Sequence, residues 1–178
     1  MEQSVIFAGF GGQGVILAGK ILAQAGMNHG LEVTWLPSYG PEMRGGTANC
    51  TIVLSDEPVG SPIVDEPTAL VALNGPSLDK FEPTLSKTGK VIVNESLIDR
   101  KLARDDLMAS YVPVNSIARD VGNARAINMV ALGALVKATE AVPLDVVKSA
   151  MREMMEASGK GKFVELNEKA LDEGYAAA

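Results

Sequence analysis

The chain has 178 residues, of which 47% are hydrophobic, so it is long enough for one domain whose core needs no disulfide or metal. Its formal net charge of −6 argues against the basic surface that grips nucleic acid, and we expect no nucleic-acid partner. The single cysteine, Cys50, and the single histidine, His29, exclude an internal disulfide and a cysteine-based zinc or iron–sulfur site. Redox or metal chemistry would therefore use an organic cofactor or another chain.

The N-terminus carries Glu2 where a signal peptide would be basic. The longest apolar run, INMVALGALV, falls short of the roughly 20 residues that cross a bilayer. We therefore expect a soluble, cytoplasmic protein with no membrane partner.

The first part of the chain alternates strand and helix signals. An apolar β-type run over 5–8 precedes a glycine-rich turn and an apolar helix over 15–25, and a second strand follows over 33–36. This order is a βαβ unit, the unit of parallel sheets. Between the second strand and a third over 48–54, the sequence PSYGPEMRGG predicts a loop where a regular unit has a crossover helix, which leaves a partly antiparallel sheet open.

Three more short strands are expected over 69–73, 91–93 and 111–114, with a helix starting near Pro76. The C-terminal third is helical: a nearly all-round apolar helix over 127–136, another starting at Pro143, and a last one over 163–175. No repeat or linker divides the chain, so residues 1–178 are expected to form one domain. The pattern predicts an α/β fold, a Rossmann-like open three-layer domain with a mostly parallel sheet, in which a mixed arrangement remains open.

The glycine turn AGFGGQGVILAGK is the strongest local motif. Gly9, Gly11 and Gly14 match G-x-G-x-x-G between a strand and a helix, where backbone N–H groups point at an anion. A dinucleotide site also needs an acidic residue at the end of the second strand, but VTWL ends in Pro37 and Ser38. The turn therefore favours a phosphate site other than NAD, while glycines that merely let the helix pack closely remain the structural alternative.

Two further features of this helix entrance are ambiguous. GVILAGK resembles a phosphate loop, but its middle is apolar and Ile21 stands where a magnesium-binding Ser or Thr is required, so Lys20 is expected to be a solvated helix residue. The amide of Gln13 can donate to a ligand oxygen or satisfy a neighbouring loop carbonyl.

The loop PSYGPEMRGG is the second concentration of polar chemistry. Like the glycine turn, it leaves the carboxyl end of a strand, where ligands gather in open α/β sheets. Arg44 offers a planar fork for phosphate or carboxylate, and Tyr39 offers a ring and a hydroxyl. Glu42 either pairs with Arg44 in a solvated loop or faces another chain. With one histidine, the sequence assembles no Ser/His/Asp set and no metal cluster, so a self-sufficient enzyme is not expected.

The order GFGGQGV then SYGPEMRGG resembles the gamma subunits of the 2-oxoacid:ferredoxin oxidoreductases. The resemblance covers nearly the whole chain and includes TANCTIVLSDEPVGSPIV, the VNES strand end and the helical third from ARAINMVALGALV. It implies CoA-dependent oxidative decarboxylation of a 2-oxoacid with reduction of ferredoxin. Thiamine diphosphate and the iron–sulfur clusters are then carried by alpha, beta and possible delta partner subunits, and this chain binds no cofactor alone.

The resemblance also assigns a role to the two loops: packing against partner subunits and closing over a shared coenzyme A. It implies no catalytic residue and no metal ligand in this chain. A CoA phosphate would meet the residues of the turn, Gly9, Gly11, Gly12, Gln13 and Gly14. The second loop would contact CoA or a partner through Ser38, Tyr39, Glu42, Arg44 and Gly45.

The motif YGPEMRGG is more similar to the gamma subunits for 2-oxoglutarate and branched-chain 2-oxoacids than to the pyruvate type, and 2-oxoglutarate is the expected substrate. The alternative to a gamma subunit is a stand-alone dinucleotide-binding oxidoreductase or redox sensor.

Overall fold

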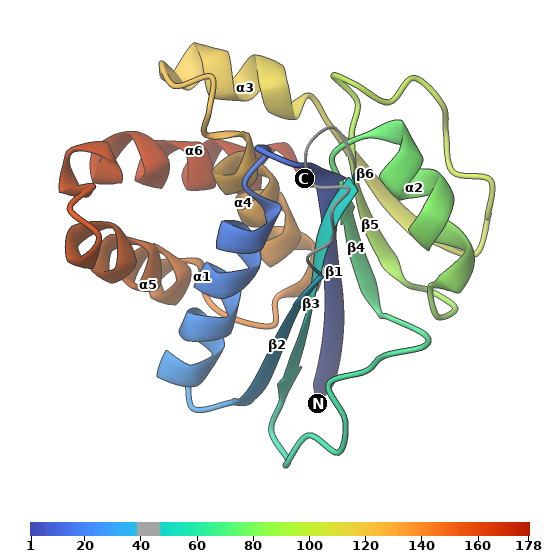
Figure 1. The fold of residues 1–178 in the computed structure, drawn as a ribbon. Coiled ribbons are helices and arrows are strands. Elements are labelled where there is room, and N and C mark those ends of the chain that lie inside the picture. Colours follow the sequence, from blue (N-terminus) through green and yellow to red (C-terminus); the bar gives the residue numbers. More distant parts are fainter. Residues whose placement is uncertain (39–46) are drawn as a thin grey trace.

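The computed structural model describes residues 1–38 and 47–178. A six-stranded sheet lies between helices on its two faces (Figure 1). Its strands, in the order β2-β3-β1-β4-β5-β6, are β1 (Glu2–Phe10), β2 (Glu32–Ser38), β3 (Thr47–Ser55), β4 (Ala69–Ala72), β5 (Lys90–Asn94) and β6 (Met108–Val112).

The sheet is mixed, because β3 runs antiparallel to both of its neighbours, β1 and β2, whereas β1, β4, β5 and β6 are parallel. The expected mostly parallel sheet of a Rossmann-like domain is confirmed, and of the two arrangements left open the sheet has the mixed one. The first βαβ unit differs from a regular one. β1 and β2 point the same way but do not pair, since β3 occupies that edge of β1 from Glu2 opposite Ser55 to Phe10 opposite Thr47.

Helices cover the two faces unequally. One face carries α1 (Val15–Asn28), α4 (Ile127–Thr139), α5 (Leu144–Ala157) and α6 (Val164–Ala177), and α3 (Val114–Val121) packs on α4 and α6. The other face is covered by α2 (Gly75–Phe81), the short 3-10 helix η2 (Glu82–Thr84) and the segment that precedes β6. A second 3-10 helix, η3 (Gly161–Phe163), leads into α6. The helical C-terminal third is therefore confirmed (Figure 1).

The expected strand over 111–114 is wrong at its end. β6 stops at Val112, Pro113 lies between the two elements, and Val114 begins α3, which the sequence analysis did not predict. The apolar side of α3 is buried through Val114, Ala118 and Val121, and this amphipathic spacing satisfies a helix, not a strand.

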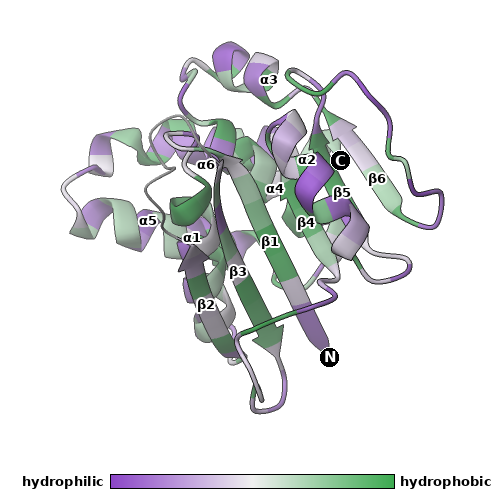
Figure 2. Ribbon diagram, turned by 45° about the vertical axis from the view of Figure 1, so that its right-hand side comes forward, coloured by the Kyte–Doolittle hydropathy of each residue, from purple (hydrophilic) through white to green (hydrophobic). Residues whose placement is uncertain are grey.

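Alternation along the strands builds two hydrophobic clusters. Phe7 and Cys50 face the α1–α4 side, whereas Ile6 and Leu70 face α2. The centre of β1 is accordingly hydrophobic throughout (Figure 2). Helix α4 is buried from Ile127 to Val136, ten of its thirteen residues, because this part lies between the sheet and α6.

Glycines allow α4 and α6 to touch backbone to backbone. A Cβ atom at Gly133 would overlap the carbonyl of Leu171, and one at Gly174 would overlap the carbonyl of Val130. Any side chain at these positions would push the two helices apart. No helix within 1–38 and 47–178 is long and apolar enough to cross a membrane.

Candidate functional site

The site lies where the chain leaves the carboxyl end of β1. Helix α1 follows β1 on one face of the sheet, and α2 follows the neighbouring strand β4 on the other, so the connections diverge between these two strands. Such a switch point is where open α/β sheets leave room for a ligand. The glycine turn after β1 and Asn74 after β4 both stand there.

The glycines of the turn have two separate roles. Gly12 and Gly14 have φ of 91° and 75°, in the left-handed region that favours glycine. A Cβ at Gly14 would lie 2.5 Å from Nδ2 of Asn128, whereas a Cβ at Gly12 would meet nothing within 4 Å. Gly14 therefore serves both conformation and packing, while Gly12 stands free at the surface.

Gly9 lies inside β1 and not in the turn itself. A Cβ there would approach Gln13 Oε1 to 2.6 Å and Leu73 Cβ to 3.2 Å. Its absence lets the turn fold back over the end of β4. The close-packing alternative therefore describes Gly9 well, whereas a Cβ at Gly12 would enter open space.

Gln13 closes the turn. Its Oε1 accepts a hydrogen bond from the backbone N–H of Phe10 at 2.6 Å, and its own N–H donates to the Phe10 carbonyl at 3.2 Å. The amide oxygen is thus occupied within the turn. Only the side-chain NH₂ is left to donate to a ligand, because no hydrogen bond joins it to the described part of the chain.

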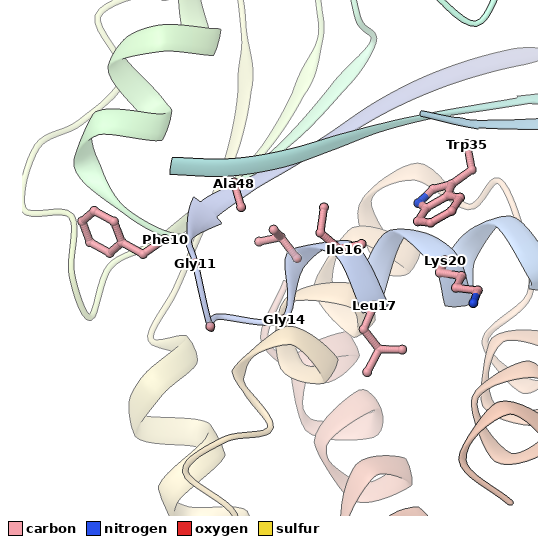
Figure 3. A pocket seen from close by; sticks show the side chains of 10 residues that line it. Phe10, Gly11, Gly14, Ile16, Leu17, Lys20, Trp35 and Ala48 are labelled. Carbon is pink, nitrogen blue, oxygen red and sulfur yellow. The ribbon is translucent and has the colours of Figure 1, made fainter. Parts of the chain in front are cut away.

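A cavity of about 450 Å³ opens beside the turn, and we call it the first cavity (Figure 3). Leu17 and Lys20 of α1 border it on one side, and Trp35 of β2 and Ala48 of β3 border it on the other. Its full lining is Phe10, Gly11, Gly12, Gly14, Val15, Ile16, Leu17, Lys20, Trp35 and Ala48. Apolar walls with a rim of backbone N–H groups suit a ligand that has both an apolar part and an anionic part.

The electrostatics of the first cavity favour an anion. Gly14 caps α1 without any side-chain hydrogen bond, and the first turn of α1 contains no acidic residue. The first N–H groups of a helix have no intrahelical acceptor and carry partial positive charge. Lys20 adds a full positive charge at the rim; it is exposed, as expected, but it also borders the cavity.

The only cysteine lies behind the cavity wall and is not reactive. Burial raises the pKa of the Cys50 thiol from 9.0 to about 12, opposed by weak interactions of which the largest is with the indole of Trp35. The thiol donates to the carbonyl of Val15 at 3.4 Å. Because only the thiolate is a nucleophile, Cys50 serves packing. Trp35 was missed in the sequence analysis, although it stands in the strand that leads to the second predicted loop.

Of the second predicted loop, the structure describes only its beginning. Ser38 is the exposed last residue of β2 and lies opposite Asn49 of β3, which in turn lies opposite Ala8 of β1. The carboxyl ends of β1 and β2 therefore share one edge of the sheet. Tyr39, Glu42, Arg44 and Gly45 lie outside the described residues.

Side-chain amides gather at the ends of β4 and β5. Asn94 Nδ2 donates to the Leu73 carbonyl at 3.1 Å and to Asn115 Oδ1 at 2.8 Å. Asn74 accepts from Ser77 N–H at 2.9 Å, while Asn74 Nδ2 is buried without a partner in the ranges 1–38 and 47–178. The motif VNES is visible in the sequence, but the burial of the asparagines around it is not. Asn128 Nδ2 donates to the Gly14 carbonyl at 3.2 Å, and no local pattern indicates this contact because the two residues are 114 positions apart.

Comparison with known proteins gives one consistent result. Residues 4–177 match the family described as pyruvate ferredoxin/flavodoxin oxidoreductase. Ketoisovalerate oxidoreductase subunit VorA of Methanothermobacter marburgensis is 42% identical over 175 residues, which are 97% of this chain and 36% of that protein. The 2-oxoglutarate synthase subunit KorC of Methanocaldococcus jannaschii is 35% identical and is covered almost completely, with 100% of this chain matching 95% of it.

The solved structures agree with this. The gamma subunit of keto/oxoacid ferredoxin oxidoreductase from Geobacter sulfurreducens has a TM-score of 0.84 at 33% identity, over 99% of this chain and 98% of that one. The chain thus spans about a third of the VorA protein but almost all of KorC and of the Geobacter subunit.

Proposed function

Because the chain belongs to the pyruvate ferredoxin/flavodoxin oxidoreductase family, we propose that it is the gamma-type subunit of a multisubunit 2-oxoacid:ferredoxin oxidoreductase. The assembled enzyme would convert a 2-oxoacid and coenzyme A into an acyl-CoA and carbon dioxide and pass the electrons to ferredoxin. The observation that carries this proposal is the family match over 4–177, reinforced by the almost complete correspondence with KorC. Thiamine diphosphate and the iron–sulfur clusters would reside on the alpha, beta and delta partners.

We propose 2-oxoglutarate as the substrate. The resemblance of YGPEMRGG and the length match with KorC support it, while the higher identity to VorA favours a branched-chain 2-oxoacid. Ferredoxin reduction by the purified complex with 2-oxoglutarate, 2-oxoisovalerate and pyruvate distinguishes the three. A kcat/KM for 2-oxoisovalerate or pyruvate above that for 2-oxoglutarate would refute this part of the proposal.

The contribution of this chain would be to hold a phosphate of coenzyme A at the first cavity. The exposed backbone at Gly12, the position of Gly11 in the cavity lining, the uncapped entrance of α1 and the charge of Lys20 support this role. The apolar wall would face the less polar part of the ligand. Ser38 with Tyr39, Glu42, Arg44 and Gly45 would complete the site or contact a partner subunit.

A matched glycine pair tests the role of the turn. Gly12 and Gly30 have similar φ of 91° and 85°, and a Cβ at either position meets nothing within 4 Å, but only Gly12 borders the first cavity. Gly12→Ala should weaken CoA binding to the assembled complex in calorimetry about tenfold, while Gly30→Ala should not. Equal affinities would remove the turn from the CoA site, and unchanged affinity in Arg44→Ala would remove Arg44.

The subunit proposal itself is tested by affinity purification of the tagged chain from its native cells. Co-purification of chains bearing thiamine diphosphate and iron–sulfur clusters is expected. The competing stand-alone dinucleotide enzyme would instead enhance NADH fluorescence on mixing. That alternative is disfavoured because β2 ends with Leu36, Pro37 and Ser38 and so provides no carboxylate for a ribose there.

A further inference from the structure

A second cavity, of about 310 Å³, lies where three helices begin. Leu17 of the first turn of α1 borders both this second cavity and the first. The beginning of α4 contributes Asn128, and the beginning of α6 contributes Asn167. Lys160, which follows the end of α5, closes the remaining side.

Among the first-turn N–H groups of these three helices, only that of Met129 in α4 donates to a described side chain, Asn128 Oδ1 at 3.0 Å. The residues that precede them, Gly14, Ala126 and Phe163, make no side-chain hydrogen bond to the first turn. Each entrance therefore presents the positive end of a helix dipole toward the same region. Glu165 of the first turn of α6 is exposed and does not line the cavity.

The charged side chains of the second cavity are all cationic. Arg125 and Lys160 line it, and neither forms an ion pair within the described residues. No described Asp or Glu lines this cavity, the first cavity, or a third of about 490 Å³ that also contains Lys160. In a chain with 22 acidic and 16 basic residues, the absence of carboxylates around these adjoining spaces marks a positive region.

A buried amide supplies independent evidence for a ligand. Asn167 is only 3% exposed and lines the second cavity, yet its side chain forms no hydrogen bond with the part of the chain that the structure describes. Asn128, by contrast, is engaged through both ends, to the Gly14 carbonyl and to the N–H of Met129. An amide that faces a cavity and has no hydrogen-bond partner among the described residues is available to donate to a ligand oxygen.

We propose that the second cavity binds a phosphate group, with Arg125 and Lys160 neutralising its charge and the Asn167 amide donating to one oxygen. Phosphate oxygens are the acceptors that guanidinium, ammonium and helix entrances bind most strongly. Inorganic phosphate and the phosphate of a nucleotide are the two sources of this chemistry. The site includes no glycine of the turn and does not rest on the proposed function.

Calorimetry of the full chain with inorganic phosphate tests the proposal, and saturable binding is expected. The double variant Arg125→Gln/Lys160→Gln should weaken it at least about tenfold, because two charge-assisted contacts are lost. Asn167→Asp should abolish binding by placing a like charge against the phosphate, with circular dichroism checking the fold. The control Lys87→Gln removes an exposed cation that borders none of the three cavities and should leave the affinity unchanged.

The source of the phosphate is resolved by repeating the titration with adenosine 3′,5′-bisphosphate. Tighter binding of the bisphosphate, lost in the same double variant, supports a nucleotide ligand, and equal affinity supports free phosphate. Absence of saturable binding of either probe would overturn the proposal. So would an affinity that Gly12→Ala reduces as much as the double variant does, because the phosphate would then occupy the first cavity.

Discussion

The two faces of the sheet differ in whether their arginines pair with carboxylates. On the α2 face, Glu82 is 3% exposed and its Oε1 accepts backbone hydrogen bonds from Ala103 at 2.5 Å and Arg104 at 2.9 Å. Its Oε2 lies 2.9 Å from the guanidinium of Arg100, which also pairs with Asp79. We call this arrangement the Glu82 cluster, and within it every charge has a partner.

On the α1–α4–α6 face, Arg125 and Lys160 border the second cavity without any carboxylate among the described residues. The contrast separates two uses of charge. Burying a carboxylate under its donors fixes a segment of chain, so the Glu82 cluster serves stability. Cations beside an unpartnered amide contribute little to folding and remain available to a ligand.

The largest effect is expected from Glu82→Ala. The variant leaves the N–H groups of Ala103 and Arg104 and the charge of Arg100 without their acceptor, so the free energy of unfolding should fall by about 3 kcal/mol. Urea denaturation of the purified chain measures it, with exposed Glu95→Ala as the control. A loss as small as that of the control would show that the segment before β6 is held by packing alone.

Cys50 is a titratable group whose pKa is shifted mainly by burial and not by a neighbouring charge. Burial raises the pKa of the thiol from its ordinary value of 9.0 to about 12 in the folded chain. Above pH 9 the unfolded chain therefore loses a proton that the folded chain keeps. Stability should therefore fall between pH 9 and 12, by about 1.4 kcal/mol per pH unit at most. Denaturation across this range should show a steeper decline for the wild type than for Cys50→Ala. Parallel pH profiles would contradict it.

An exposed ion pair should matter much less than the Glu82 cluster. Lys148 Nζ lies 2.9 Å from both carboxylate oxygens of Asp172, joining α5 to α6 near the surface. Asp172→Asn should lower the free energy of unfolding by about 0.5 kcal/mol, and the loss should shrink in high salt because water and ions screen such pairs. A salt-independent loss above about 2 kcal/mol would erase the distinction between buried and exposed pairing.

The smallest effect on folding is expected from Arg125→Gln. Since Arg125 is exposed and pairs with no carboxylate in the described ranges, the free energy of unfolding should change by less than about 0.5 kcal/mol. Thermal denaturation with and without inorganic phosphate should nevertheless show a smaller rise in Tm than the wild type shows. Destabilisation comparable to Glu82→Ala would assign Arg125 to the fold.

The fold was largely predictable because the strands and helices carry strong local signals. The runs that begin with Val5, Val91 and Ile127 are apolar enough to identify their elements without any tertiary information. Strand order was not accessible, since the insertion of β3 between β1 and β2 depends on pairing between segments far apart in sequence. Helix α3 was missed although Val114, Ala118 and Val121 have helical spacing, because the strand was extended through Pro113.

The candidate site was predictable only where its residues are contiguous. Gly11 and Gly12 fall in one motif, and the structure places both beside the first cavity. The hydrogen bond from Asn128 to Gly14 joins segments that are far apart in sequence, and the second cavity is likewise lined by Arg125 and Asn167 from different segments. Each of these residues alone is indistinguishable from a surface or core polar residue. Of the second cavity, only Lys160 stands in a motif of its own, GKGK, which is typical both of a phosphate contact and of a solvated helix end.

Because α4 is enclosed, hydrogen exchange at its amides should report the global unfolding of the molecule. All ten residues from Ile127 to Val136 are buried, between the sheet and a neighbouring helix that touches them through glycine. Deuterium can reach the amides of such a helix only when these layers separate, so their exchange should follow global unfolding. The end of the same helix, from the exposed Lys137 to Thr139, is less buried and should exchange by local fraying, so one helix would report both local and global opening.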